Sequence, residues 1–220
     1  MANALQFVPA SVNQLSFACN IASFDHDANM KANAGNTMIF GLFKKKNSNQ
    51  TIVNRQYYAL TSAARIPVFY EDFGVPDTVM GRFEMLSIVM ILFFRRTATS
   101  GPSGQELAQE IVDAFFQDID HSIRELGIGD QGVPKRMKKL AGMFYGRLET
   151  YAAALDSGDE TALAAALHRN IHPKATDIQD MSALAHWMTT TETAMSAVSE
   201  DTISRGLLVV PQPVREGEEQ

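Results

Sequence analysis

The chain has 220 residues, of which 45% are hydrophobic, and its 25 acidic against 19 basic side chains leave a net charge of −6. This length and apolar fraction predict one globular domain with tails. The acidic balance argues against a general nucleic-acid binder, which is basic over its domain, so no DNA partner is expected. The single cysteine, Cys19, excludes an intrachain disulfide framework and suits a reducing compartment.

Residues 1–50 are rich in Asn, Ala and Ser and show no persistent apolar period, so we expect a poorly ordered leader. No Lys or Arg precedes its weakly apolar start, which argues against a secretory signal. The first arginine is Arg55, which argues against an Arg-rich transit peptide. These features favour a bacterial cytoplasmic protein.

The segment 38–46 reads M-I-F-G-L-F-K-K-K and has three interpretations. We favour a frayed terminus with solubilising lysines. The alternatives are peripheral contact with an anionic inner membrane, apolar side down, and a translation start at Met38.

A helical domain is predicted over 51–200. The apolar face of its first helix is formed by Val53, Tyr57, Leu60 and Ala64. Pro67 ends this helix, because the residue before a proline avoids the α conformation. The connector that follows contains Gly74 and Pro76, which break regular structure. We expect its aromatic side chains to pack on the next helix, and an exposed aromatic patch for a partner is the alternative.

The stretch 78–96 is predicted to be the buried central helix of the domain. Its segment Met85–Phe94 has no charge and only Ser87 as a polar residue. Ten such residues are too few to span a membrane, which needs about 20, and are typical of a core helix. Asp77 or Thr78 is expected to cap the start, while two arginines close the end, where the helix dipole favours cations. The β-branched residues also suit a strand, but the length and the helical neighbours favour a helix.

A long helix is predicted next, opened by a capping box at Ser103-x-x-Glu106 and ended at Gly127. The run 127–132 reads G-I-G-D-Q-G and matches the letters of a dinucleotide fingerprint. That fingerprint requires a strand before it and a βαβ unit around it, whereas a long helix comes before it here. The glycines therefore predict a turn between two helices, and no cofactor is expected.

The helix predicted at 134–156 is amphipathic and has cations in its first turns. These basic residues are Lys135, Arg136, Lys138 and Lys139. The helix dipole opposes positive charge at a helix start, which indicates another use, such as binding phosphate or an acidic partner. A solvated face that is salt-bridged to its neighbours is the alternative. Gly142 and Gly146 permit close approach of another backbone, at a cost of about 1 kcal/mol per glycine.

Further helices and an arm complete the predicted domain. Capping boxes at Ser157-x-x-Glu160 and Thr176-x-x-Gln179 are expected to open the last two helices. Residues 201–220 are expected to form an extended arm and an acidic tail.

Two motifs carry a family resemblance. Residues 64–85 read A-R-I-P-V-F-Y-E-D-F-G-V-P-D-T-V-M-G-R-F-E-M, and residues 126–151 read L-G-I-G-D-Q-G-V-P-K-R-M-K-K-L-A-G-M-F-Y-G-R-L-E-T-Y. With them the chain resembles the ubiquinol–cytochrome c chaperone family over roughly 51–172. Its mitochondrial members assist assembly of ubiquinol–cytochrome c reductase, handling new cytochrome b near the ribosome and inner membrane together with a small helper protein.

The periodicities and the resemblance together predict an all-α, single-domain protein of about six or seven helices. The resemblance implies a non-enzymatic assembly chaperone without a cofactor, which binds a hydrophobic client such as cytochrome b. The expected partner-binding residues are Phe69, Tyr70, Asp77, Arg82, Asp130, Lys135, Arg136, Lys138, Lys139, Tyr145, Gly146 and Arg147.

Two other function classes stay open from the sequence. A helical small-molecule or metal-binding protein would use Asp118, His121, His168 or His172. His168 and His172 have metal-pair spacing, but no Glu stands in the H-E-x-x-H place and Pro173 disrupts the helix end. The other class is a general protein-interaction module with no respiratory role.

Overall fold

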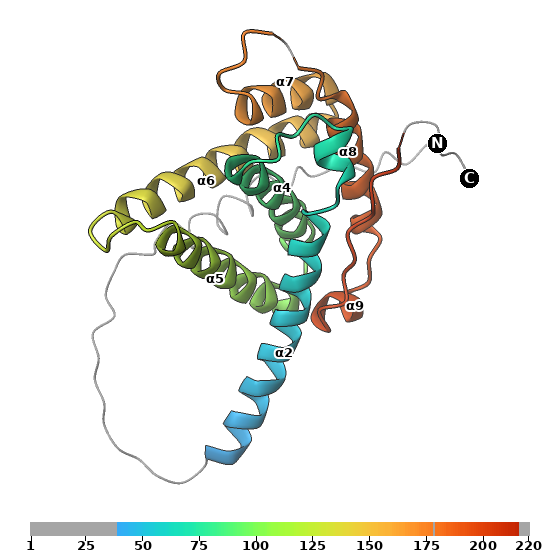
Figure 1. The fold of residues 1–220 in the computed structure, drawn as a ribbon. Coiled ribbons are helices and arrows are strands. Elements are labelled where there is room, and N and C mark those ends of the chain that lie inside the picture. The colour runs from blue at the N-terminus through green and yellow to red at the C-terminus, as the bar shows by residue number, and fades with distance from the viewer. Residues whose placement is uncertain (1–38, 178, 216–220) are drawn as a thin grey trace, which may run out of the picture.

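The computed structural model describes residues 39–177 and 179–215, and this part of the chain forms helices joined by turns (Figure 1). The longer helices are α2 (Ile39–Ala63), α4 (Val79–Thr97), α5 (Pro102–Glu125), α6 (Val133–Ser157), α7 (Glu160–Ile171) and α8 (Ser182–Ser196), and the short ones are α3 (Val68–Glu71) and α9 (Glu200–Ser204). No strand occurs in the described ranges, and the all-α prediction is confirmed.

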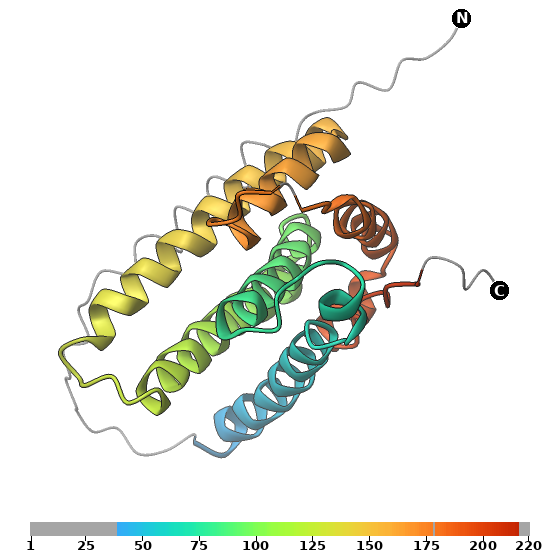
Figure 2. The same cartoon turned by 45° about the horizontal axis from the view of Figure 1, so that its top comes forward.

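Helix α4 lies at the centre of the domain and packs against α2, α5, α6, α7 and α8. Figure 2 shows it between α6 and α7 on one side and α2 and α8 on the other. Every residue from Ser87 to Phe94 is buried, and Ile91 and Phe93 have no exposed surface. The apolar run therefore forms the core from a helix that faces protein on nearly every side. Within the described ranges, no helix is both long enough and apolar enough to cross a membrane.

The ends of α4 follow the predicted chemistry closely. Thr78 is its N-cap, and the Thr78 hydroxyl accepts a hydrogen bond from the Gly81 amide. Arg95 and Arg96 lie in its last turn. Arg95 donates to Asp156 and Glu192, and Arg96 donates to Glu200. The two arginines thus complement the dipole and also tie the end of α4 to α6, α8 and α9.

Helix α2 begins at Ile39, well before the predicted start at Thr51. Residues 39–50 show no persistent apolar period in the sequence, so periodicity did not mark the start of this helix. The helix extends into the segment expected to be a leader. The expectations for residues 1–37 and for a start at Met38 fall outside the described residues.

Three predicted capping boxes are wrong. Ser103 lies inside α5, whose N-cap is Gly101, and Ser157 is the last residue of α6. Asp159 caps α7 instead, accepting from the Ala162 amide. Helix α8 starts at Ser182, beyond the box predicted at Thr176. The observed helix starts use Gly101, Asp159 and, for the Ser182 amide of α8, the Asp180 carboxylate. Several residues near a helix start can satisfy the same unpaired amides, so the box pattern alone does not fix the first residue.

The C-terminal arm docks through the side-chain amide of Gln56, which is fully buried on α2. Its nitrogen donates to the Leu208 carbonyl at 2.9 Å, and its oxygen accepts from the Leu208 amide at 3.0 Å. Leu208 and Val210 are buried while Val209 is exposed, which is the alternation of an extended strand. Trp187 of α8 donates to the Pro211 carbonyl on the other side. The Gln56 amide therefore supplies the two backbone hydrogen bonds that a neighbouring strand would give Leu208, while Arg55 and Trp187 hold the arm before and after it.

We expect Gln56→Leu to lower the free energy of unfolding by about 1–3 kcal/mol, because the buried amide and carbonyl of Leu208 lose their partners. Urea unfolding followed by circular dichroism measures this change. The matched control is Gln50→Leu on the same helix, since Gln50 is exposed and donates a hydrogen bond to Asn54 in the next turn. Equal stability of the two variants would show that the arm is not held by Gln56.

Candidate functional site

The first family motif forms the connector from α2 to α4, and a tight turn fixes its shape. A Cβ atom on Gly81 would lie 1.9 Å from the Pro76 carbonyl oxygen, so only glycine fits there. This close approach folds residues 76–78 back over the first turn of α4. Asp77 is thereby held beside Arg82, whose Nε donates to the Asp77 carboxylate at 2.7 Å.

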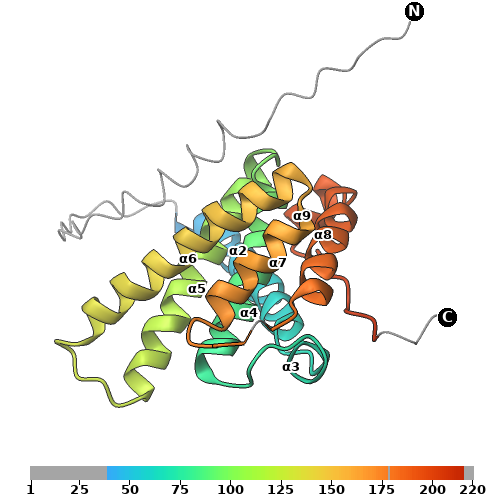
Figure 3. The ribbon, with the colours of Figure 1, turned by 90° about the horizontal axis from the view of Figure 1, so that it is seen from above.

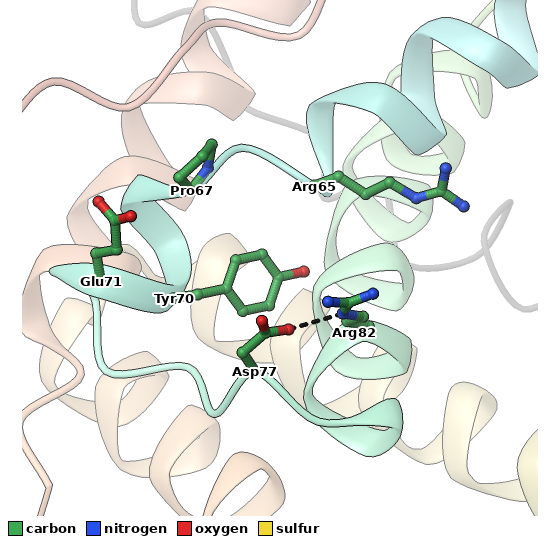
Figure 4. A pocket seen from close by; sticks show the side chains of 6 residues that line it. All are labelled: Arg65, Pro67, Tyr70, Glu71, Asp77 and Arg82. Atoms are coloured by element: carbon green, nitrogen blue, oxygen red, sulfur yellow. Dashed lines mark hydrogen bonds and ion pairs between the residues drawn. The ribbon is translucent and has the colours of Figure 1, made fainter.

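A pocket of about 330 Å³ opens within this connector, between α3 and the first turn of α4 (Figure 4). It is lined by Arg65, Pro67, Tyr70, Glu71, Asp77 and Arg82. The Tyr70 hydroxyl donates to the Ala64 carbonyl at 2.7 Å, and burial raises its pKa above the ordinary value. Hydrogen bonding by Arg82 lowers the pKa of Asp77. At neutral pH the pocket therefore contains a neutral phenol, two carboxylates and two guanidinium groups.

Three of the predicted contact residues in this motif lie together in the pocket, and the fourth does not. Tyr70, Asp77 and Arg82 line it, whereas Phe69 has no exposed surface. Phe69 packs edge-on against Phe73 and Trp187 in the core. In α3, neighbouring aromatic residues point to different sides, so Phe69 anchors the connector while Tyr70 borders the pocket. The prediction of Phe69 as a contact residue is corrected to a core residue.

The predicted contact residue Arg147 is likewise buried, and it forms an ion pair with Glu84 of the central helix. The Arg147 Nε and Nη2 atoms donate to the two carboxylate oxygens of Glu84, and Nη1 donates to the Met143 carbonyl. The two side chains are 8% and 3% exposed. Burial raises the pKa of Glu84, and the guanidinium of Arg147 opposes that shift. The pair joins the two family motifs inside the domain and is not available to a partner.

The remaining predicted residues of the second motif lie on the surface of the α5–α6 hairpin. Gly127, with φ of 77°, ends α5 and turns the chain toward α6. Figure 3 shows this turn at the opposite end of the domain from α8 and the arm. Asp130 pairs with Arg124 at 2.6 Å, so its carboxylate supports the turn. The glycine run is therefore a helix–helix turn, as predicted.

Cations occupy the outer face of α6 where it leaves this turn. Lys135, Arg136, Lys138 and Lys139 are exposed, and Tyr145 is partly buried. A Cβ atom on Gly142 or Gly146 would meet nothing within 4 Å. No described part of the chain makes use of the close approach that these two glycines permit. The basic residues and the bare glycines form one continuous outward face, which we call the α6 outer face.

The groups considered for metal binding have other contacts. Asp118 accepts from the Tyr57 hydroxyl at 3.0 Å, and His121 lies 3.2 Å from Glu125. His172 contacts the Gly74 carbonyl at 2.8 Å, while His168 stacks on the His172 ring. In residues 39–177 and 179–215, no group of three or more His, Cys, Asp or Glu side chains is placed to hold a metal ion.

Three exposed apolar residues within the two motifs were missed by the sequence analysis. Val79 and Met80, in the first turn of α4, are 66% and 44% exposed, and Leu126, at the α5–α6 turn, is 60% exposed. Large apolar side chains left in water beside charged groups are a feature of surfaces that bind proteins. The available signal was their position at the ends of apolar stripes, where a helix leaves the core.

Comparisons with known proteins agree on one family. The model of the ubiquinol-cytochrome C chaperone family matches residues 71–210. The crystal structure of the Cbp3 homologue from Brucella abortus is 47% identical in sequence and has a TM-score of 0.72, covering 80% of this chain and 97% of that chain. The ubiquinol-cytochrome-c reductase complex assembly factor 1 of Xenopus laevis is 25% identical over 123 residues. That alignment covers 56% of this chain and 61% of the relative, so the chain spans less than two thirds of the frog protein.

Proposed function

Because the chain belongs to the ubiquinol-cytochrome C chaperone family, we propose that it is a non-enzymatic chaperone for assembly of ubiquinol–cytochrome c reductase. The observation that carries the proposal is the family match over residues 71–210, which includes most of the first motif, all of the second and every helix from α4 to α9. The relative named as an assembly factor for this reductase complex supports the same role.

The proposed mechanism is holding a hydrophobic client until its partner subunits arrive, and the proposed client is cytochrome b. Val79 and Met80 offer apolar contact beside the pocket, and Leu126 does so at the hairpin turn. The α6 outer face supplies cations for a second contact with a small helper protein, the ribosome or an anionic membrane surface. Separate apolar and charged surfaces would let one chaperone hold its client and engage such a partner at the same time.

The α6 outer face is tested by changing Lys135, Lys138 and Lys139 to Glu together. The variant should remain folded, because exposed charges near a helix end contribute only about 0.3–1 kcal/mol each and anions suit the helix start. In a strain that lacks the gene, the variant should restore several-fold less assembled cytochrome b than the wild-type gene. Thermal melting and a cytochrome b difference spectrum provide the two measurements.

Lys174→Glu is the charge-reversal control, since Lys174 is exposed and lies in the loop after α7. It should restore assembly fully. If the triple variant folds and restores cytochrome b to the level of this control, the α6 outer face is only a solvent-exposed surface and not a partner contact. A deletion strain with normal cytochrome b would overturn the proposed function itself.

A further inference from the structure

One cation in the lining of the connector pocket stands apart from the ion pairs around it. Asp77 is paired with Arg82, and Glu71 shares Arg215 of the arm with Asp72, at 2.6 and 3.1 Å. Among the described residues, no carboxylate lies within ion-pair distance of the remaining cation, Arg65. The pocket therefore has one guanidinium available for an anion.

The two guanidinium groups of the lining lie on one side of the pocket. In Figure 4 the hydroxyl end of Tyr70 points toward the side on which Arg65 and Arg82 lie, while Glu71 is on the other side of the ring. The charges of Arg65 and Arg82 both act on this hydroxyl, favouring its negative form. Burial has the larger effect and keeps the phenol neutral, so no phenolate competes for the cations.

Two exposed apolar residues next to the pocket residues in the sequence favour one kind of anion. Val79 and Met80 lie between Asp77 and Arg82 in the sequence and are exposed in the first turn of α4. A strongly hydrated anion such as free phosphate gains nothing from these two residues. A carboxylate on an apolar peptide can use both the guanidinium and the exposed apolar side chains.

We propose that this pocket binds an Asp or Glu side chain carried by an apolar segment of the client. Arg65 binds the carboxylate, and Arg82 is the second donor once the incoming carboxylate takes the place of Asp77. That exchange is favourable enough to occur because the Arg82–Asp77 pair is exposed, at 66% and 58%, and exposed pairs are weak. This inference rests on the proposed holding function and identifies the feature of the client that the chaperone recognises.

The test uses two acetylated, amidated peptides of leucine, alanine and serine, which differ only in one central Glu or Gln. Fluorescence anisotropy with the full chain should show the Glu peptide binding about tenfold more tightly, as expected for one charge-assisted contact. Arg65→Gln should remove the difference between the peptides. Asp77→Asn should increase it, because Arg82 is then free to bind the ligand.

Lys174→Gln is the control, since it removes one exposed cation elsewhere and should leave both affinities unchanged. Equal binding of the two peptides to the wild-type chain, or an unchanged preference in Arg65→Gln, would overturn the pocket assignment while leaving apolar holding intact. Stronger competition by phosphate than by acetate at equal ionic strength would also overturn it, in favour of a phosphate site. Failure to bind either peptide would count against holding itself, which separates the two proposals.

Discussion

Ile91→Asp is expected to prevent folding. Ile91 has no exposed surface and lies in the run of α4 that is buried from Ser87 to Phe94. An aspartate there would be an unpaired charge in the core, with a penalty of several kcal/mol. That penalty is comparable to the roughly 5–15 kcal/mol total stability of a domain. We expect the variant to be insoluble or to lack a cooperative melting transition, and Phe93→Asp to behave in the same way.

The same helix provides the control, Val79→Asp. Val79 is 66% exposed and occupies the first position of α4, where the dipole favours a negative charge. Its melting temperature, measured by circular dichroism, should be close to that of the unaltered protein. Normal folding of Ile91→Asp and Phe93→Asp would mean that the run is not the core.

For the buried pair of Glu84 and Arg147, we expect replacing one residue to lower the free energy of unfolding far more than replacing both. Arg147→Met leaves the Glu84 carboxylate buried without its partner, which costs about 3–5 kcal/mol. Replacing both, as Glu84→Leu with Arg147→Met, removes the charges together and should recover most of that loss. Urea unfolding of the two single variants and the double variant gives the coupling energy directly.

In the native protein, the two charge-assisted hydrogen bonds between Arg147 and Glu84 offset the large cost of removing both charges from water. Apolar side chains of similar volume do not incur that cost. If the double variant is as unstable as the single ones, the loss comes from packing at the contact of α4 and α6. In that case the unpaired buried charge is not the main cause of the instability of the single variants.

The sequence predicts the fold best where one segment contains all the information. The burial of α4 follows from ten consecutive uncharged positions, and no knowledge of its neighbours is needed. The α5–α6 turn follows in the same way from Gly127 and the helices on either side. The start of α2 was misplaced because residues 39–50 show no persistent apolar period in the sequence.

The candidate site was harder to predict, because burial of a charged residue depends on a distant partner. Arg147 stands in the motif F-Y-G-R among surface cations, and its partner Glu84 is 63 residues earlier. Neither residue shows by itself that the two meet in the core. Phe69 and Tyr70 are adjacent aromatics in the same motif, and only the position of α3 against Trp187 determines which is buried. The sequence located both motifs but could not separate their structural residues from their exposed ones.

The link between Gln56 and Leu208 also sets an order for folding during synthesis. The two residues are 152 positions apart, so their hydrogen bonds cannot form until nearly all of the described domain has left the ribosome. Until then the Gln56 side chain and the apolar surface that the arm will cover remain open to water. Exposed apolar surface of this kind favours aggregation of partly made chains. The C-terminal arm is therefore among the last parts of the described domain to be positioned during synthesis, and its docking completes the burial of Gln56.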